Sequence, residues 1–249
     1  MTSTSPTLST ALVTGATSGI GRATAVALAA SGIHVAVSGR DKARGDQAVA
    51  AIRAAGGQAD FVPADLSGAA SATRLAEAAA AVLGHVDILV NNAGSGAAGP
   101  TVDTTEAAFD ELFALNVKVP YFLTVALVPG MAGRGAGVIV NVSTMVAEFG
   151  LDGMALYGST KAALELLTKA WSAEFGPKGI RVNAVAPGPV STEGTEGMRE
   201  AQGYLASLAP ARRLGTPEEI AAAIVYLASP QAAFTHGVVL PVDGGRVAV

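Results

Sequence analysis

The chain has 249 residues, of which half are hydrophobic and only 14% are charged. A chain of this length and composition can bury a full core, which is typical of a globular protein. The net charge of −4, without any basic run, argues against a nucleic-acid partner. The absence of cysteine excludes disulfides, thiol nucleophiles and cysteine-bound metals, and the three scattered histidines indicate no metal site.

Residues 1–10 are rich in Ser and Thr and contain neither a basic residue nor an apolar stretch. They have the features of neither a signal peptide nor a transit peptide, and we expect them to be flexible. No apolar run elsewhere is both long enough and uncharged enough to predict a membrane-spanning helix. The sequence therefore predicts a cytoplasmic protein that has no membrane partner.

Short β-branched runs alternate along the chain with alanine-rich helical stretches. The predicted strands are Ala11–Val13, Val35–Ser38, Asp60–Val62, Ile88–Val90, Val138–Val142, Arg181–Val185 and Val238–Pro241. The predicted helices are Ile20–Ala30, Ala43–Ala55, Ser71–Leu83, Thr105–Leu127, Tyr157–Phe175 and Pro217–Leu227. Apolar strands separated by helices are typical of a parallel sheet buried on both faces. The pattern predicts a single Rossmann-type α/β domain over residues 11–249, with a doubly wound parallel sheet of about seven strands and helices on both faces.

A glycine-rich turn joins the first predicted strand to the first predicted helix. Its sequence is Thr14-Gly15-Ala16-Thr17-Ser18-Gly19-Ile20-Gly21. Glycines let the backbone turn tightly and approach a pyrophosphate, whose charge the helix N-terminus then stabilises. The spacing G-x-x-x-G-x-G differs from the commoner G-x-G-x-x-G, and a tight strand–helix connection is the alternative interpretation. The position after the first strand favours nucleotide binding.

The end of the second predicted strand bears on the choice of nicotinamide cofactor. A carboxylate there would bind the ribose 2′-hydroxyl of NAD, whereas an arginine suits the 2′-phosphate of NADP. The strand ends at Ser38-Gly39, and Arg40 and Asp41 follow. Asp41 is placed to cap the next helix, which is a structural role. We therefore expect NADP(H) to be favoured over NAD(H), with Arg40 contacting the phosphate.

Polar residues also follow the third and fourth predicted strands. Asp65, after the third strand, could accept a hydrogen bond from an adenine amino group or cap the next helix. Asn91-Asn92-Ala93-Gly94 follows the fourth strand. Small residues there would let a cofactor lie close, while the asparagines join neighbouring strands.

Tyr157 and Lys161 are four residues apart near the start of a predicted helix, so they share one face. A neighbouring ammonium favours a phenolate and would lower the pKa of Tyr157 towards the working range of an acid–base catalyst. Asn116 is a polar residue in an apolar helical run, and Pro120 cannot donate to its carbonyl. That carbonyl could hold a water that leads protons towards Lys161, or the proline could simply kink the helix.

In this order and spacing, these segments carry a specific resemblance. The matching pieces are Thr14–Gly21, Asn91–Gly94, Asn116, Tyr157–Lys161, Pro187-Gly188 and Val242-Asp243-Gly244-Gly245. The chain resembles the short-chain dehydrogenase/reductase family over nearly its whole length, most of all the 3-oxoacyl-carrier-protein reductases and polyketide ketoreductases. The resemblance implies an oxidoreductase that transfers hydride between a nicotinamide cofactor and a ketone or secondary alcohol. It also implies a homo-oligomer, usually a tetramer, formed through the apolar helices Thr105–Leu127 and Tyr157–Phe175.

The resemblance implies a catalytic tetrad of Asn, Ser, Tyr and Lys, and three members map onto Asn116, Tyr157 and Lys161. The family's serine stands thirteen residues before the tyrosine and three after the strand asparagine, which here selects Thr144. Ser143 would replace it if the loop held one extra residue. We favour Thr144, because a one-residue shift along a strand turns the side chain to the other face.

The resemblance also implies contacts to the cofactor. They map onto the glycine turn (Gly15, Thr17, Ser18, Gly19, Ile20 and Gly21), Arg40, Asp65, Leu66, Asn91, Ala93, Gly94, Tyr157, Lys161, Pro187, Gly188, Val190 and Thr192. Within this set, the turn would hold the pyrophosphate, and Val190 and Thr192 would receive the carboxamide. Many relatives that use NADP have a basic residue where Ser18 stands, so Arg40 would act with less help.

The sequence gives less information about the substrate than about the reaction. Residues 191–213 combine glycines with apolar side chains and are expected to form a substrate lid. A carrier-protein substrate would require a basic rim, for which Arg134, Lys169 and Lys178 are sparse candidates. The prediction is an NADPH-dependent ketoreductase, with a 3-oxoacyl-carrier-protein reductase as the alternative enzyme. A cofactor-sensing binding protein is the alternative from another class, although such a chain would be expected to lose Tyr157 or Lys161.

Overall fold

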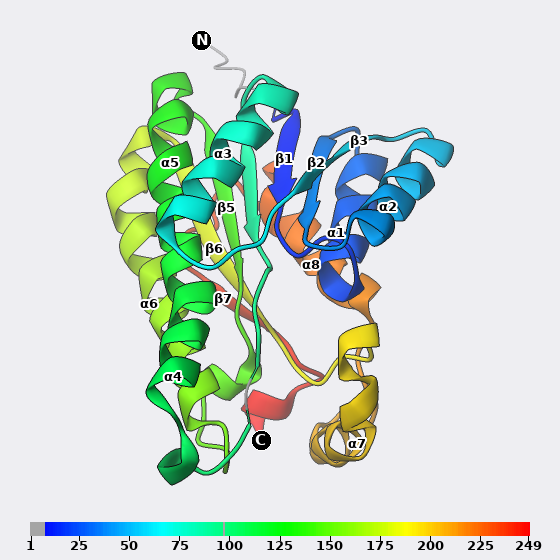
Figure 1. Cartoon of the computed structure of the whole chain (residues 1–249), viewed down its shortest axis with the longest axis vertical. Helices are drawn as coiled ribbons and strands as arrows, with labels where there is room; N and C mark the ends of the chain where they lie inside the picture. Colours follow the sequence, from blue (N-terminus) through cyan, green and yellow to red (C-terminus); the bar gives the residue numbers. More distant parts are fainter. Residues whose placement is uncertain (1–7, 97) are drawn as a thin grey trace.

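A computed structural model describes residues 8–96 and 98–249 of the chain (Figure 1). Seven strands form one sheet in the order β3-β2-β1-β4-β5-β6-β7, and every neighbouring pair is parallel. The strands are β1 (Thr10–Val13), β2 (His34–Gly39), β3 (Gln58–Pro63), β4 (Ile88–Asn91), β5 (Gly137–Val142), β6 (Ile180–Pro187) and β7 (Val239–Val242). This confirms the predicted single parallel sheet of the Rossmann type.

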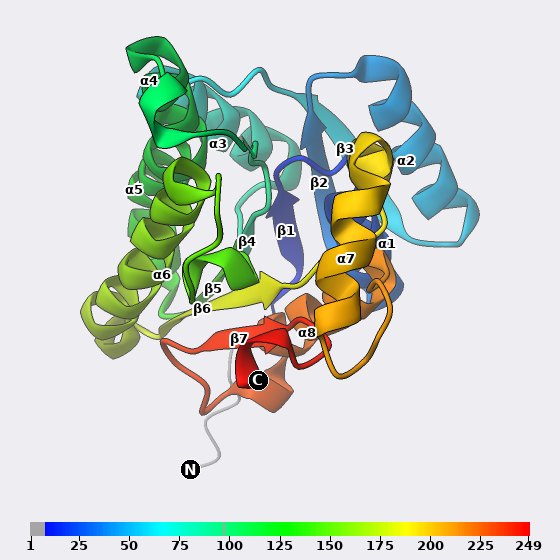
Figure 2. The same cartoon turned by 90° about the horizontal axis from the view of Figure 1, so that it is seen from below.

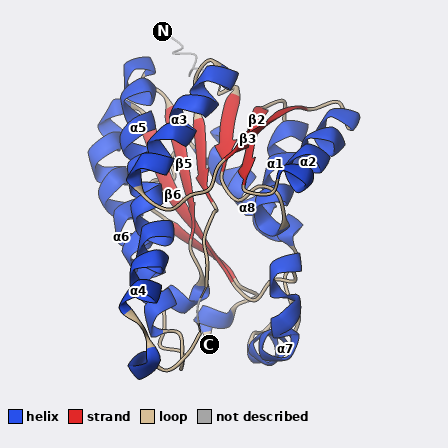
Figure 3. Ribbon diagram, viewed as in Figure 1, coloured by secondary structure: helices blue, strands red, loops and turns tan. Residues whose placement is uncertain are grey.

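Helices cover both faces of the sheet (Figure 3). They are α1 (Gly19–Ala30), α2 (Lys42–Ala54), α3 (Ala69–Leu83), α4 (Glu106–Phe113), α5 (Val119–Arg134), α6 (Ala155–Phe175), α7 (Arg199–Leu208) and α8 (Pro217–Ala228). One buried cluster joins the sheet to α1, α2 and α8, and a second joins it to α3, α5 and α6.

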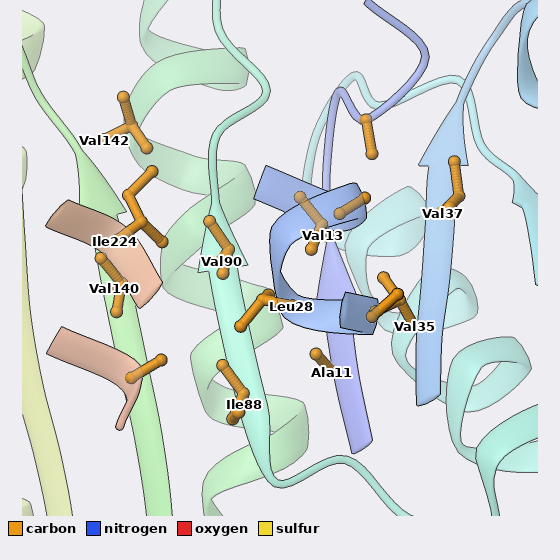
Figure 4. Close-up of a cluster of buried hydrophobic side chains, with 14 of the residues drawn as sticks. Ala11, Val13, Leu28, Val35, Val37, Ile88, Val90, Val140, Val142 and Ile224 are labelled. Carbon is orange, nitrogen blue, oxygen red and sulfur yellow. The ribbon is translucent and has the colours of Figure 1, made fainter. Parts of the chain in front are cut away.

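Alternation along the strands divides the core into these two clusters. In β1, Ala11 and Val13 pack towards α1, while Leu12 between them packs towards the other face. Figure 4 shows the first cluster, where Leu28 of α1 and Ile224 of α8 lie against β-branched residues of the strands. Successive strand residues point to opposite faces, so a strand covered on both sides must be apolar throughout.

The strand order places the point of topological reversal between β1 and β4. From β1 the chain builds outward to β2 and β3, and then returns to β4 on the other side. In open parallel sheets, ligands bind beyond the carboxyl ends of the strands at such a point of reversal. This edge is at the bottom of Figure 1, and Figure 2 views the molecule from that side, with α7 lying beyond the strand ends.

The predicted helix Thr105–Leu127 differs from the structure. A π-helical turn, Ala114–Lys118, separates α4 from α5, and the amide of Val119 donates to the carbonyl of Ala114 five residues earlier. A π turn has one more residue than an α turn, and Pro120 directly after it lacks the amide that a regular helix would use. The helical stretch therefore continues, but its sequence periodicity shifts by one residue at the π turn.

The segment predicted as a lid contains regular structure that the sequence pattern did not predict. A 3₁₀ helix, Glu193–Met198, is followed by α7. The two ends of the segment are fixed to each other, because Val190 and Gly215 form a parallel bridge and the amide of Ser191 donates to Gly215. Residues 191–214 therefore form one loop that is closed at its base.

The segment predicted to be flexible, residues 1–10, includes residues at its end that belong to the folded domain. Thr10 is the first residue of β1, and the amide of Ser9 donates to Asp87 at 2.9 Å. Leu8 packs against the core. Residues 1–7, the rest of the predicted segment, lie outside the described part of the chain.

One helical stretch also differs from the prediction about membrane spans. By length and composition, Glu106–Arg134 is apolar enough to cross a membrane. In this fold Leu123, Leu127 and Met131 of that stretch are buried among residues of α3 and the sheet. Packing in the core accounts for the apolar character of this helix.

Candidate active site

The glycine-rich turn between β1 and α1 has no room for side chains. Gly15 and Gly19 have φ values of +62° and +51°, which L-residues with a side chain rarely adopt. A Cβ on Gly21 would lie 2.3 Å from the carbonyl oxygen of Gly15. Ser18 precedes α1 without a side-chain hydrogen bond to the helix N-terminus. The turn therefore offers backbone amides, rather than a side chain, to a ligand at this end of α1.

Asparagines at the end of β4 join the central strands, as the sequence predicts. Asn92 Nδ2 donates to the carbonyls of Thr14 and Gly15, at 2.8 and 3.1 Å. Asn91 Nδ2 donates to Asn141 of β5 at 2.9 Å, and Asn141 in turn donates to Thr168 of α6. Asn91 Oδ1 is buried and has no partner within the described residues. A free buried acceptor at a strand end suits a ribose hydroxyl.

The residues predicted to select the cofactor lie at the ends of β2 and β3. Arg40 is exposed directly after β2. Asp41 caps α2 by accepting from the amide of Arg44 at 3.0 Å, as expected for its structural role. Asp65 is exposed after β3, and Leu66 next to it packs partly into the core.

The structure excludes one interpretation of Asp65, that it caps the following helix. The N-cap of α3 is Gly68, and the hydroxyl of Ser71 accepts from the amides of Ser67 and Gly68. The cap was misplaced because the connection after β3 is longer than a capping aspartate would require. The carboxylate of Asp65 is thus left for other contacts.

Thr144 and Ser143, the two hydroxyls at the end of β5, have different partners. The Thr144 hydroxyl lies close enough to the Tyr157 phenol of α6 to lower its pKa. Ser143 donates to the carboxyl group of the buried Glu165 at 2.5 Å. Only Thr144 is therefore directed at the phenol.

The pKa of Tyr157 departs from the simple sequence expectation. Burial raises the pKa of the Tyr157 phenol above its usual range, and the hydrogen bond with Thr144 opposes that rise. The phenol is therefore protonated at neutral pH. A protonated phenol is the form that can donate a proton to a carbonyl oxygen.

Lys161 lies one helical turn beyond Tyr157 and is almost fully buried, with 5% of its surface exposed. Its Nζ donates to the carbonyl of Val142, the last residue of β5, at 2.8 Å. Burial lowers the pKa of Lys161 to about 8, and the nearby carboxyl group of Glu165 opposes that fall. A Cβ on Gly94 would lie 3.2 Å from Lys161 Nζ, so the loop after β4 passes directly over the amine.

Asn116 is fully buried in the π-helical turn, where its side chain is held on three sides. Its Oδ1 accepts from the amide of Ser95, and its Nδ2 donates to the carbonyl of Ser95 and to Thr160 Oγ1, at 2.9 and 3.0 Å. The same virtual Cβ on Gly94 lies 3.2 Å from Asn116 Oδ1. The side chains of Asn116 and Lys161 thus both lie close to Gly94.

Three residues of this arrangement, Thr160, Glu165 and Ser95, were not predicted as site residues from the sequence. Thr160 and Glu165 are buried polar residues on the face of α6 that carries Lys161, and their i+3 and i+8 spacing from Tyr157 could have indicated them. Ser95 contributes through its backbone amide and carbonyl, which almost any residue type would provide, so its identity gives no signal in the sequence.

Residues at the end of β6 and directly after it connect the candidate site to loop 191–214. A Cβ on Gly188 would lie 2.7 Å from Cα of Asp243, so the Pro187-Gly188 turn packs on the segment after β7. Val190 is buried at the base of loop 191–214. The methyl group of Thr192 would lie 3.2 Å from a Cβ on Gly19, which brings the start of this loop against the glycine turn.

Known proteins resemble the chain over nearly its whole length. The model of a protein family described as enoyl-(acyl carrier protein) reductase matches residues 15–246. The chain is 37% identical over 239 residues to the 7α-hydroxysteroid dehydrogenase of Escherichia coli K12, covering 95% of this chain and 93% of that protein.

Two solved structures share both fold and sequence with the chain. A short-chain dehydrogenase/reductase family protein has a TM-score of 0.89 and 49% identity, covering 97% of this chain and 98% of its own. A candidate NAD(P)-dependent gluconate 5-dehydrogenase from Beutenbergia cavernae, solved with NADP at low occupancy, has a TM-score of 0.92 and 37% identity, covering 97% of each chain. The chain therefore belongs to the short-chain dehydrogenase/reductase family, and it is an NAD(P)-dependent oxidoreductase that acts on alcohol or ketone groups.

Proposed function

We propose that the protein is an NADP(H)-dependent ketoreductase that interconverts a ketone and a secondary alcohol. One observation carries this proposal: the Tyr157 phenol, beside Thr144, lies one helical turn from the buried Lys161 at the carboxyl edge of the sheet. The phenol can donate a proton, and the second hydroxyl can form a hydrogen bond to the substrate oxygen. The ammonium group can stabilise the phenolate that remains.

The residues present fit a nicotinamide dinucleotide. The turn at Gly15–Gly21 would hold the pyrophosphate, because its glycines leave a cradle that side chains would fill. Asp65 would contact adenine, Asn91 and Gly94 would contact the ribose, and Val190 and Thr192 would contact the carboxamide, as the family resemblance implies. When bound, the cofactor supplies or accepts the hydride.

The chain's own residues would bind the carbonyl and supply the proton. Thr144 would donate a hydrogen bond to the carbonyl oxygen, and Tyr157 would transfer its phenolic proton to the same oxygen. Lys161 would restore the proton to Tyr157 and hold the ribose hydroxyls. Asn116 would fix the loop at Ser95 and, through its backbone carbonyl, hold a water beside Lys161.

The proposed preference for NADP(H) rests on the end of β2. Arg40 is exposed there, while Asp41 is engaged with the N-terminus of α2 and with Arg44, at 3.3 Å. A free guanidinium and an engaged carboxylate favour a 2′-phosphate over a 2′-hydroxyl. The NADP in the Beutenbergia cavernae structure is consistent with this preference.

Two of the three basic residues considered for a carrier-protein rim lie at the wrong edge of the sheet. Arg134 binds the carbonyl of Val86 before β4, and Lys178 precedes β6 and packs on Phe175. Both are at the amino edge, opposite the candidate site. We therefore propose a small, partly apolar ketone as the substrate, because Tyr204 and Leu208 expose apolar surface on the proposed lid.

Self-association is part of the same proposal. Phe109 of α4, Tyr121 and Val125 of α5, and Leu166 of α6 are exposed apolar residues. Such a surface is typical of a subunit interface, and a tetramer is the assembly that the family resemblance implies. Cytoplasmic location stays a prediction.

A substrate panel tests the function. The wild type is mixed with NADPH or NADH and with β-keto thioesters, cyclic ketones and keto sugars, and loss of absorbance by the reduced cofactor is followed. We expect turnover of at least one ketone with NADPH, and its loss in Tyr157→Phe with cofactor binding retained. Cofactor binding without turnover of any substrate would favour a cofactor sensor, and a preference for β-keto thioesters on a carrier protein would favour the carrier-protein reductase.

A further inference from the structure

An acidic side chain of the proposed lid lies on the glycine-rich turn. Glu193 is the first residue of the 3₁₀ helix Glu193–Met198, and its Oε2 accepts from the amide of Gly19 at 3.1 Å. Its other oxygen, Oε1, forms an ion pair with the guanidinium of Arg22 in α1. The carboxylate thus makes two contacts with the first turn of α1, far away in the sequence.

Gly19 begins α1, a helix of 12 residues, and its amide is one of the groups that have no partner inside the helix. Such amides attract anions, and the partial positive charge of the helix N-terminus adds to the attraction. A carboxylate presents oxygen acceptors and a negative charge, as a phosphate does. Glu193 therefore satisfies, from within the chain, the same kind of contact that a dinucleotide pyrophosphate would make here.

The neighbouring residues strengthen this contact. Thr192 lies directly over Gly19, with its methyl group 3.2 Å from where a Cβ would be. Hydrogen bonds from its own backbone amide, from Arg22 and from Gly19 hold the pKa of Glu193 below its usual range, so the group is ionised at neutral pH. The other carboxylate of this helix, Glu196, lies instead 3.7 Å from Arg199 of α7.

We propose that Glu193 competes with the cofactor pyrophosphate for the amide of Gly19 and the guanidinium of Arg22. Glu193 is then a residue that sets the affinity for the cofactor, and binding of the cofactor releases the start of the lid from α1. This inference rests on the proposed function, because it requires the dinucleotide to lie along the glycine turn. The pyrophosphate and the Glu193 carboxylate repel each other, so they cannot share the amide without a loss of affinity.

The test compares Glu193→Gln with Glu196→Gln. The first substitution removes the competing charge and keeps the size of the side chain, and the second removes a charge of the same 3₁₀ helix that pairs with Arg199 instead of the turn. Two quantities are measured on each full-length protein: the Kd for NADPH and for NADH by calorimetry, and hydrogen exchange of residues 191–213 without cofactor. Circular dichroism checks that each variant is folded.

We expect Glu193→Gln to bind both cofactors about tenfold more tightly than the wild type. Its lid should exchange faster without cofactor, while Glu196→Gln should match the wild type in both measurements. Unchanged or weaker cofactor binding by a folded Glu193→Gln would overturn competition and leave the proposed function intact. If the wild type bound neither cofactor, both this inference and the proposed function would fail.

Discussion

Ser143 Oγ donates a hydrogen bond of 2.5 Å to the carboxyl group of Glu165. The hydroxyl next to it in the sequence, that of Thr144, lies beside the phenol of Tyr157 instead. Adjacent residues at a strand end face opposite ways, so the two hydroxyls serve different neighbours. Their substitution should therefore have different effects.

Thr144→Val should lower kcat by about 100-fold or more, because it removes a donor to the developing oxyanion and keeps the shape of the side chain. Thr144→Ser should retain most of the activity. Ser143→Ala should leave kcat close to that of the wild type but cost about 1–3 kcal/mol of stability, because Glu165 loses its donor. Steady-state kinetics and urea unfolding on the three variants measure these effects. A larger loss of kcat in Ser143→Ala than in Thr144→Val would refute our assignment.

Lys161 makes stability depend on pH. Its pKa is lowered by burial to about 8, from an ordinary value of 10.5. Burial of the ammonium therefore costs the folded state about 3 kcal/mol below pH 8, and this cost disappears as the pH rises to 10.5. The stability advantage of Lys161→Met over the wild type should accordingly shrink by that amount across this window.

Urea unfolding at several pH values between 7 and 10.5 measures this difference. Lys169→Met is the matched control, because Lys169 is exposed on the same helix. The change expected of Lys161→Met is measured relative to this control. A constant difference for Lys161→Met relative to the control would show that burial does not shift this group.

Arg40 should decide between the two nicotinamide cofactors. Arg40→Ala should lower kcat/KM with NADPH by about 10- to 100-fold, the value of a charged hydrogen bond, and should leave kcat/KM with NADH almost unchanged. Arg44→Ala is the control, because Arg44 is an exposed arginine of α2 that is paired with Asp41. A wild type that prefers NADH would contradict our interpretation of the end of β2.

Gly94 should tolerate no side chain. A Cβ there would lie 3.2 Å from both Lys161 Nζ and Asn116 Oδ1, so Gly94→Ala should displace one of them and lower kcat by about tenfold or more. Gly99→Ala, in the same loop, adds a methyl group with no heavy atom within 4 Å and should keep its activity. Equal kinetics for both variants, with thermal unfolding unchanged, would show that the loop adapts without cost.

The sequence predicted the sheet well because its strands are buried on both faces. Every predicted strand begins and ends within two residues of the observed one. A continuous apolar run between helices is a strong local signal for such a strand. Tyr157 and Lys161 lie on one helix, so their four-residue spacing alone predicts that they share a face.

Other parts of the site depend on contacts that no local pattern records. Whether Thr144 or Ser143 meets Tyr157 depends on how β5 enters the following loop. The contact of Glu193 with Gly19 joins segments that are 174 residues apart, and neither residue has a periodic neighbour that indicates the other. The change of helix type at Asn116 was missed because apolar periodicity is nearly the same for α and π turns over five residues.

The π-helical turn Ala114–Lys118 also affects how this chain could change by insertion or deletion. Such a turn holds one residue more than an α-helical turn, so removing a single residue from it would restore an uninterrupted helix from α4 to α5. The core contacts of α5 and the direction of α4 would survive, because the π turn takes up its one extra residue by widening rather than by rotating the flanking helices. The orientation of Asn116 towards Ser95 and Thr160 would be lost. A one-residue deletion could thus leave a folded protein without its catalytic geometry.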